Sequence, residues 1–220
     1  MPKVVLLSKR ASGIPLADFH AQLRDAMQRS VPPQGCTRYV QSHTLPQGYK
    51  KGELLFDAVE ETWFDDLQDA RAYLHALKLG RPALTFVDAQ VSLPMIVDPH
   101  VVKNERIPEG AVKNIEFVNR RPGMALNPFR EYWRQVHGPL GSTIPTILRY
   151  EQNHCNDDEY VDGEPRFDGL AITWFASTRQ MREGAATEPY RLTREDEKNF
   201  LPDGHLPIII TTEVIDTGSI

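Results

Sequence analysis

Short apolar segments alternate with amphipathic stretches along this chain, and the same order occurs twice. Residues 3–8 and 113–119 are short segments rich in aliphatic residues, a pattern that predicts buried strands. A turn with a glycine follows each of them. Next come apolar residues spaced three and four apart: Phe19, Leu23 and Met27 in the first stretch, and Phe129, Trp133 and Val136 in the second. This spacing places the side chains on one face of a helix.

Four further elements complete each copy. The pattern predicts strands at 37–44 and 148–155, strands at 54–64 and 167–175, helices that begin at 66–69 and near 177, and last strands at 90–97 and 207–215. The order in each copy is therefore β-α-β-β-α-β, which is the ferredoxin-like unit. We predict an α+β fold built from two such units.

Individual residues also recur in register between the two copies. Phe19 matches Phe129, Arg38 matches Arg149, and the matches lie 110 or 111 residues apart. A fixed spacing over half a protein indicates a tandem duplication. The predicted parts are a first repeat at 1–98, a linker at 99–111 and a second repeat at 112–220. Such units expose one face of their sheet, so the two can bury those faces against each other.

Composition narrows the classes of protein that remain. The 220 residues are 40% hydrophobic and 25% charged, as in ordinary water-soluble domains, and a mean hydropathy of −0.42 leaves no membrane-spanning run. The net charge of −5 and the lack of a basic cluster argue against a nucleic-acid partner. After Lys3, only the four residues 4–7 form an apolar run before charged residues return. This run is too short for a secretion signal, so we expect a cytoplasmic protein.

The second copy carries the motif of a known family. Residues 129–140 read Phe-Arg-Glu-Tyr-Trp-Arg-Gln-Val-His-Gly-Pro-Leu, and the strands 149–154 and 173–175 follow. These residues resemble an EthD-domain protein of the dimeric α/β-barrel superfamily, over about residues 113 to 215. The first copy resembles the family more loosely, because Met27 stands where the second copy has His137 and no Gly-Pro-Leu follows it.

The resemblance implies a fold and a range of activities. The paired sheets of the two units would close into an internal, pseudo-dimeric α/β barrel, in a monomer or a further homodimer. Members of the superfamily take part in ether and aromatic catabolism, dehydrate or cyclise polyketide-like phenols, isomerise muconolactone, oxygenate anthrones without a cofactor, or use haem. Fold alone does not choose among these reactions. Their shared feature is an apolar pocket between sheet and helices that holds a flat organic molecule.

His137 is the leading candidate for catalysis. It is expected at the C-terminus of the first helix of the second copy, where the helix dipole favours the imidazolium form. A histidine can both accept and return a proton near neutral pH, which dehydration, isomerisation and cyclisation all require. The alternative is a structural cap that donates to the last carbonyls of the helix. The presence of Met27 in the first copy favours catalysis, because it predicts one working site.

Other residues are expected to complete the site. Tyr132 and His154 would hold and polarise a substrate oxygen, although each could equally make a structural hydrogen bond. The predicted substrate-binding residues are Trp133, Phe129, Trp174, Tyr150 and Arg120. Large aromatic residues also dominate protein cores, and a guanidinium also closes sheet ends by bonding loop carbonyls. The alternative for the aromatic residues is therefore packing in the core, and the alternative for Arg120 is a structural role.

The motifs present in the sequence, and those missing from it, favour a cofactor-independent enzyme. The sequence contains no HxxxH or CxxC metal motif, no nucleotide-binding glycine motif and no Gly-x-Ser-x-Gly, so neither a metal nor a cofactor is expected. The expected enzyme is of lyase or isomerase type and acts on an aromatic or polyketide-like ketone or phenol. The alternatives are an oxygen-using or haem-associated monooxygenase, with a histidine as the iron ligand, and a non-catalytic binding protein of a degradative pathway.

Overall fold

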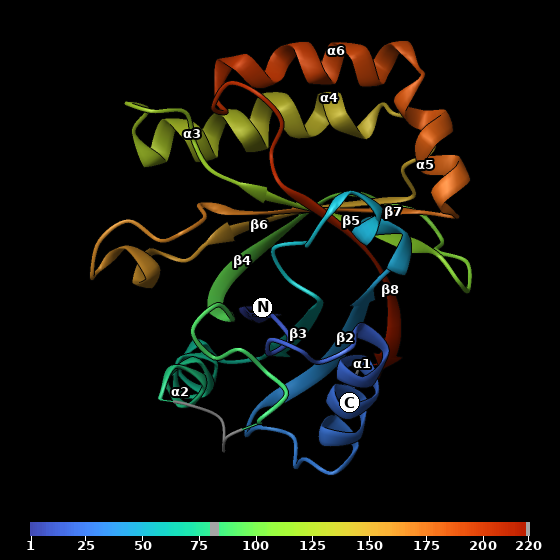
Figure 1. The fold of residues 1–220 in the computed structure, drawn as a ribbon. Coiled ribbons are helices and arrows are strands. Elements are labelled where there is room, and N and C mark those ends of the chain that lie inside the picture. The colour runs from blue at the N-terminus through green and yellow to red at the C-terminus, as the bar shows by residue number, and fades with distance from the viewer. Residues whose placement is uncertain (80–83, 219–220) are drawn as a thin grey trace. The chain divides into compact units, whose positions relative to one another are not determined.

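The computed structural model describes residues 1–79 and 84–218, and it shows a mixed fold of strands and helices (Figure 1). The chain divides into two compact units. Unit 1 consists of residues 1–98 and 211–220, and unit 2 of residues 99–210. Strands β4 and β8 each contribute to both units, because the division between units falls inside them.

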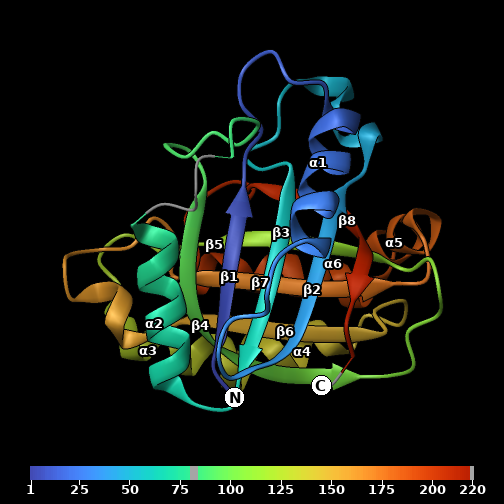
Figure 2. The same cartoon turned by 90° about the horizontal axis from the view of Figure 1, so that it is seen from below.

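Unit 1 contains one antiparallel sheet with two helices. Its elements are β1 (Lys3–Ser8), α1 (Leu16–Gln28), β2 (Cys36–Thr44), the 3-10 turn η1 (Pro46–Lys51), β3 (Ala58–Phe64), α2 (Leu67–Lys78), the first part of β4 (Leu93–Asn104) and the last part of β8 (Ile208–Asp216). The strand order is β4-β1-β3-β2-β8, with Lys3 opposite Trp63 and Thr44 opposite Thr211. Figure 2 shows α1 and α2 lying along these strands.

The helices of unit 1 are held by narrow apolar stripes. In α1, Phe19 and Leu23 lie four residues apart and are buried against Ala58 and Phe86. In α2, Ala70 and Leu74 have the same spacing and form a second cluster with the strands. All six residues of β1 are buried, as its unbroken apolar run predicts.

Unit 2 contains a second antiparallel sheet under a layer of helices. Its elements are β5 (Val112–Val118), α3 (Leu126–Tyr132), the π-helical turn η2 (Trp133–His137), α4 (Gly138–Ser142), β6 (Arg149–Cys155), the 3-10 turn η3 (Asp157–Tyr160), β7 (Gly169–Phe175), α5 (Thr178–Ala185), α6 (Glu188–Asp196) and the 3-10 turn η4 (Glu197–Asn199). The strand order is β8-β5-β7-β6-β4. Within this unit, α3, α4 and α6 cover one face of the sheet (Figure 1).

Three features differ from the sequence prediction. Strand β4 continues to Asn104, into the segment 99–111 expected to be a linker, because Val101 and Val102 extend it beyond Pro99. The helix expected to end at His137 continues through η2 into α4, with Pro139 in the first turn of α4. Helix α6 was not predicted at all. The domain boundaries 1–98 and 112–220, and the pairing of the two sheets into one barrel, stay predictions.

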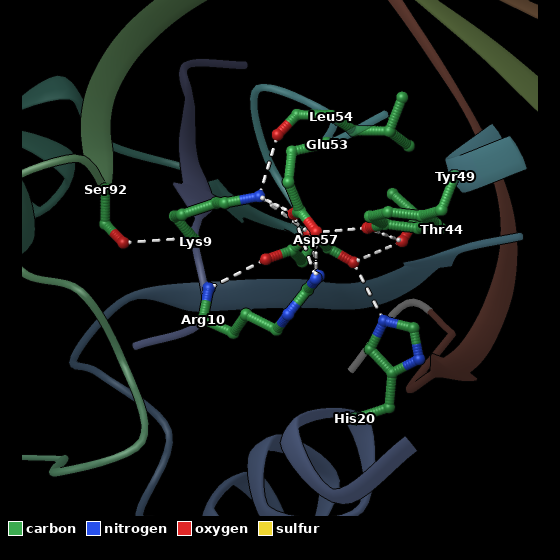
Figure 3. A network of polar contacts seen from close by, with 9 residues as sticks. All are labelled: Lys9, Arg10, His20, Thr44, Tyr49, Glu53, Leu54, Asp57 and Ser92. Atoms are coloured by element: carbon green, nitrogen blue, oxygen red, sulfur yellow. Dashed lines mark hydrogen bonds and ion pairs between the residues drawn. The ribbon is translucent and has the colours of Figure 1, made fainter. Parts of the chain in front are cut away.

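A buried carboxylate organises the end of the sheet in unit 1 (Figure 3). Asp57 is fully buried and accepts hydrogen bonds from the Arg10 backbone N at 2.8 Å, from Arg10 Nη1 at 2.8 Å and from Tyr49 Oη at 2.5 Å. Lys9 Nζ lies 3.2 Å from the same carboxylate, and Glu53 binds both cations from the exposed side. This cluster joins β1 to the turn before β3.

Unit 2 has the same cluster at matching positions. Asp168 accepts hydrogen bonds from the Arg120 backbone N at 2.8 Å, from the Arg120 guanidinium and from Tyr160 Oη at 2.7 Å. Glu164 binds Arg120 at 2.7 Å, as Glu53 binds Arg10. The cluster therefore assigns Arg120 to the end of the sheet, which is the structural alternative to substrate binding.

Replacing the central carboxylate tests how much this cluster stabilises the fold. We expect Asp57→Ala to lower the free energy of unfolding by about 2–3 kcal/mol, because it leaves the buried side of Arg10 and the Tyr49 hydroxyl without an acceptor. Chemical denaturation of the variant measures this loss. The control is Asp162→Ala, which removes an exposed carboxylate and should change stability little. Equal stability of the two variants would contradict the structural role of Asp57.

Candidate active site

Unit 2 contains a partly open cavity of about 210 Å³ between its sheet and its helices. The wall is mainly apolar. Its apolar side chains include Val118, Ile144, Ile147, Phe175, Met181, Phe200, Leu201, Leu206 and Ile208. A small number of polar groups interrupts this wall, which is the usual composition of a small-molecule site.

Strand alternation determines which residues of the sheet reach the cavity. Asn114, Glu116 and Val118 are every second residue of β5, so their side chains lie on one face of the sheet. Ala171, Thr173 and Phe175 do the same on β7. Residues between them, such as Trp174, face the opposite side.

The π-helical turn η2 brings Trp133 and His137 to the cavity wall. The backbone N–H of Gly138 donates to Trp133 O, five residues back, and Gln152 Nε2 donates to the same carbonyl oxygen at 2.7 Å. Gly138 is required for this approach, because a Cβ there would lie 2.6 Å from Gln152 Nε2. Single π turns occur often at functional sites.

His137 is paired with a carboxylate. Its Nδ1 lies 2.9 Å from Asp196 Oδ2, at the end of α6. The other oxygen of Asp196 accepts a hydrogen bond from Tyr132 Oη at 2.6 Å and one from Asn199 Nδ2 at 2.9 Å. Asp196 therefore fixes the ring orientation of His137 and leaves Nε2 for a ligand.

Burial and hydrogen bonding set the charge states of this pair. Burial lowers the pKa of His137, and the hydrogen bond and charge of Asp196 offset this only in part, so the neutral form of the imidazole is favoured. Burial also acts on Asp196, but the hydrogen bonds from Tyr132, His137 and Asn199 outweigh it and hold its pKa below the usual value. A neutral imidazole beside an ionised carboxylate is the arrangement of a general base.

Two carboxyl groups also line the cavity. Glu116 accepts a hydrogen bond from Asn114 Nδ2 at 3.2 Å, and Glu197 is bound by Arg194 Nη1 at 2.6 Å. Burial raises the pKa of Glu116, and burial together with the charge of Glu116 raises the pKa of Glu197 to about 7, although Arg194 opposes this. Protonated carboxyl groups are therefore populated in this cavity near neutral pH.

The cavity brings together three of the residues predicted from the sequence. His137, Trp133 and Tyr150 all line it. Trp133 Nε1 donates to Tyr150 Oη at 3.0 Å, and burial raises the pKa of Tyr150, so the tyrosine is a neutral part of the wall. The continuation of the helix past His137 removes the expected stabilisation of the imidazolium by a helix C-terminus.

The other predicted residues lie away from the cavity wall. Tyr132 binds Asp196, so it is not placed to polarise a substrate oxygen directly. The His154 ring packs 4.5 Å from Trp133, and burial lowers its pKa to about 3, which makes it a neutral packing residue. Phe129 is fully buried between Trp133 and Phe200. Trp174 packs against Lys113 and Arg149 on the other face of β7.

Sequence reasoning missed Asp196, Glu116 and Glu197. Asp196 and Glu197 belong to a run of charged residues that is typical of a solvated surface. Glu116 did leave a signal, because a carboxylate in register with Asn114 and Val118 on a largely buried strand has to face something polar.

Two kinds of feature are absent from the described residues. Over 1–79 and 84–218, no group of three histidine, cysteine, aspartate or glutamate side chains is arranged to hold a metal ion. In the same part of the chain, no helix has the length and apolar character needed to span a membrane.

Titration of the histidines tests the pairing of His137 with Asp196. We expect the pKa of His137 to lie below 6.5 in the wild type. It should fall further in Asp196→Asn, because the variant lacks the carboxylate charge that stabilises the imidazolium in the wild type. NMR titration of the imidazole resonances measures both values. Asp203→Asn, at an exposed loop position, is the control and should leave the His137 pKa unchanged. An unchanged His137 pKa in Asp196→Asn would refute the pairing.

Comparison with solved structures shows that the fold is a known one. The chain is similar to an "anthrone oxidase-like protein" (8% identity, 98% of this chain and 91% of that chain, TM-score 0.64). It is also similar to a "putative monooxygenase" from Lactobacillus acidophilus (12% identity, 100% and 98%, TM-score 0.56). A third similar structure is a mutant chlorite dismutase from Candidatus Nitrospira defluvii (9% identity, 97% and 91%, TM-score 0.51).

These likenesses show that the chain has a mixed α and β fold similar to that of these proteins. The similar proteins carry enzyme names, while their low identity to this chain limits the likeness to the fold. No curated protein sequence matches the chain. Residues 121–203, which include the π-helical turn, α6 and most of the cavity wall, match the EthD domain family. The resemblance to the EthD family predicted from the His-Gly-Pro-Leu motif is thereby confirmed for residues 121–203, which match the EthD domain.

Proposed function

We propose that unit 2 is a small-molecule enzyme that moves a proton on an aromatic or polyketide-like ketone or phenol without a cofactor. The observation that carries the proposal is the imidazole of His137, which lies 2.9 Å from Asp196 and lines an apolar cavity. An apolar wall suits a flat organic molecule, and a fixed base suits a reaction that begins with removal of a proton.

The chemistry follows from the orientation of His137. Nδ1–H donates to Asp196, so the lone pair of Nε2 takes a proton from the carbon next to a substrate carbonyl. The C–H electron pair becomes the C=C bond of an enolate, and the negative charge moves to the oxygen. Return of the proton to another atom completes an isomerisation, and loss of a neighbouring hydroxyl as water completes a dehydration. Asp196 stabilises the imidazolium that forms in between.

Tyr132 acts in this proposal as a positioning residue. It was expected to hold the substrate oxygen, but its hydroxyl donates to Asp196 Oδ1 at 2.6 Å, where Asn199 also donates. These two hydrogen bonds keep the carboxylate oriented toward His137. Tyr132 thus supports the base and does not touch the substrate.

A tandem duplication explains why one unit alone carries this site. The Arg10–Asp57 cluster of unit 1 matches the Arg120–Asp168 cluster of unit 2 at spacings of 110 and 111 residues. Unit 1 also has a cavity, of about 370 Å³, but Met27 lines it at the position that matches His137. In our proposal unit 1 is a duplicate that has lost the base.

The second candidate function is an oxygen-using oxidation of the same type of ketone. The names of the similar structures favour it, since one is "anthrone oxidase-like" and another is called a monooxygenase. Both candidates begin with the same proton removal by His137. They separate afterwards, because an oxidase consumes oxygen and an isomerase or dehydratase does not.

Haem does not fit the cavity of unit 2. The cavity volume of about 210 Å³ is smaller than the roughly 300–1,000 Å³ of ordinary ligand pockets, and a macrocycle needs more room than a single aromatic system. We therefore assign no step to haem.

The remaining parts of the proposal concern the setting of the enzyme. The ligand is a small hydrophobic or aromatic molecule, and the reaction belongs to the degradation of such compounds. The protein acts in the cytoplasm as a monomer with an internal pseudo-dimer or as a homodimer.

Hydrogen exchange tests the proposal without knowledge of the natural substrate. The probes are anthrone and the smaller 2-tetralone, whose C–H bonds beside the carbonyl exchange with D2O and are followed by proton NMR. We expect the wild type to accelerate exchange and His137→Gln to lose on the order of 100-fold of that rate, because general base catalysis contributes this much. His75→Gln, at an exposed position of α2, is the matched control and should retain the full rate.

The same assay separates the candidate functions. Exchange without oxygen uptake, measured with an oxygen electrode, supports the isomerase or dehydratase type, and uptake that depends on His137 supports the oxidase. If the wild type binds the probes but catalyses neither exchange nor oxygen uptake, the protein is a non-catalytic binding protein. Exchange that persists in His137→Gln would overturn the assignment of the base.

The pH dependence of exchange provides a further prediction. The base is active when neutral, and burial holds its pKa below the ordinary 6.5. We therefore expect kcat/KM to rise with pH and to level off with a midpoint below 6.5, and we expect this midpoint to shift lower in Asp196→Asn. The pH–rate profile of both proteins measures the two midpoints. A rate that falls over this range would mean that His137 acts in its protonated form.

A further inference from the structure

A buried glutamine on β6 connects the sheet of unit 2 to the π-helical turn. Gln152 is fully buried, and its Nε2 donates to Trp133 O at 2.7 Å and to Tyr150 Oη at 3.3 Å. Its Oε1 lies 3.4 Å from His154 Nε2. The shortest of these three hydrogen bonds is therefore the one to the helix.

Unit 1 has the same glutamine with the order of the contacts reversed. Gln41 Nε2 lies 3.5 Å from the carbonyl oxygen of Leu23, the residue that matches Trp133 in the first copy. The contacts of Gln41 along the strand are shorter, at 3.0 Å to Tyr39 Oη and 2.9 Å to His43 Nε2. The helix that carries Leu23, α1, is a regular α-helix. The two copies therefore differ in whether this amide binds more closely to the helix or to its own strand.

The short contact to the helix occurs where the helical turn is wider. In a regular α-helix, Trp133 O would accept from the N–H of His137, four residues later. In η2 it accepts from the N–H of Gly138 and from Gln152 instead. A side chain that donates to a helix carbonyl interrupts the α-helical hydrogen bonds. Donation by Gln152 therefore favours the π-helical turn over the α-helical one.

The spacing of the two copies agrees with a wider turn in the second. Matching residues lie 110 apart in the helix, as Leu23 and Trp133 do, and 111 apart in the strand, as Gln41 and Gln152 do. The second copy thus has one more residue between these two points. A turn that closes after five residues holds one more residue than a turn that closes after four.

The orientation of His137 depends on this turn. His137 is the last residue of η2, and its Nδ1 lies 2.9 Å from Asp196 Oδ2. If Trp133 O bonded to the N–H of His137, the turn would close one residue earlier and His137 would leave the helix axis in another direction. The contact with Asp196 would then be lost.

We propose that Gln152 is a positioning residue of this site, which holds the π-helical turn through Trp133 O and thereby directs His137 to Asp196 and to the cavity. Gln152 is outside the set of residues that line the cavity, so it acts through the backbone and not on a substrate. The inference rests on the proposed function only where activity is measured. In unit 1 the same amide stays with its strand, and Met27 stands at the position of His137.

A double-mutant cycle, followed by NMR titration of the His137 imidazole, tests this role. Gln152→Met keeps the approximate length of the side chain and removes its amide. Asp196→Asn alone should lower the pKa of His137, because it removes a neighbouring negative charge. In the Gln152→Met background the same change should leave the pKa almost unaltered, because His137 no longer lies beside that side chain. We also expect Gln152→Met to lower kcat for hydrogen exchange at least about tenfold, since a small misplacement of a catalytic group has a large effect on rate.

The first copy supplies the matched control. Gln41→Met removes the same amide from the same position of the other sheet, so it reproduces any general loss of stability. It should keep the full effect of Asp196→Asn on the His137 pKa and the wild-type exchange rate. Loss of that effect in Gln41→Met would contradict a role specific to Gln152.

Gly138→Ala tests the same contact from the helix and replaces the first variant if Gln152→Met does not fold. Its Cβ would lie 2.6 Å from Gln152 Nε2, so it displaces the amide without removing it. The effect of Asp196→Asn should again disappear. An effect of wild-type size in either the Gln152→Met or the Gly138→Ala background would overturn the inference.

This experiment fails separately from the proposed function, because the pKa of His137 is measured without turnover. A protein that shows the expected cycle but never exchanges hydrogen would contradict the proposed function alone. An active protein in which Asp196→Asn has the same effect with and without Gln152 would contradict the positioning role alone.

Discussion

The absence of a backbone N–H at Pro139 is the constraint from which the arrangement of the site follows. A proline inside a helix removes one hydrogen bond and clashes with the carbonyl four residues back. Here the helix accommodates it with one wider turn, in which Gly138 donates to Trp133 O five residues back and Gln152 supplies a second donor to that oxygen. The wider turn directs both Trp133 and His137 toward the sheet. The helix then continues, so His137 lies inside a helical layer and its imidazole is desolvated instead of exposed at a helix end.

Desolvation then gives the two sides of the cavity their different chemistry. Burial penalises the charged form of every titratable group here, so it lowers the pKa of His137 and raises the pKa values of Glu116 and Glu197. One apolar wall therefore moves the pKa of the base down and the pKa values of the acids up. Asp196 escapes this tendency because three hydrogen-bond donors surround it, and that is why it can remain an anion beside His137.

The sequence predicted the elements that follow from local residue patterns, and it missed the contacts between residues that are far apart in the chain. The strands and helices α1, α2 and α5 follow from alternation, apolar stripes and capping residues such as Asp66 and Ser177. Helix α6 was not predicted because it is largely polar. Thr193 is its buried residue, so the helix has no apolar stripe that a sequence pattern could reveal. Its last residue, Asp196, is the partner of His137, and 59 residues separate the two. Pairing over that distance depends on the packing of α6 against α4, and the spacing of residues along the sequence does not show this packing.

The comparison of the two units explains how a base can be present in one and absent from the other. The clusters around Asp57 and Asp168 stabilise the ends of the sheets with the same set of arginine, tyrosine and glutamate, and neither contributes to the walls of the two cavities described above. The space under the helices carries other residues: Met27 in place of His137, and Glu60 at the position of Ala171. Because the stabilising clusters lie apart from this space, a substitution on the cavity wall changes the chemistry of a unit while leaving the interactions that hold its sheet in place.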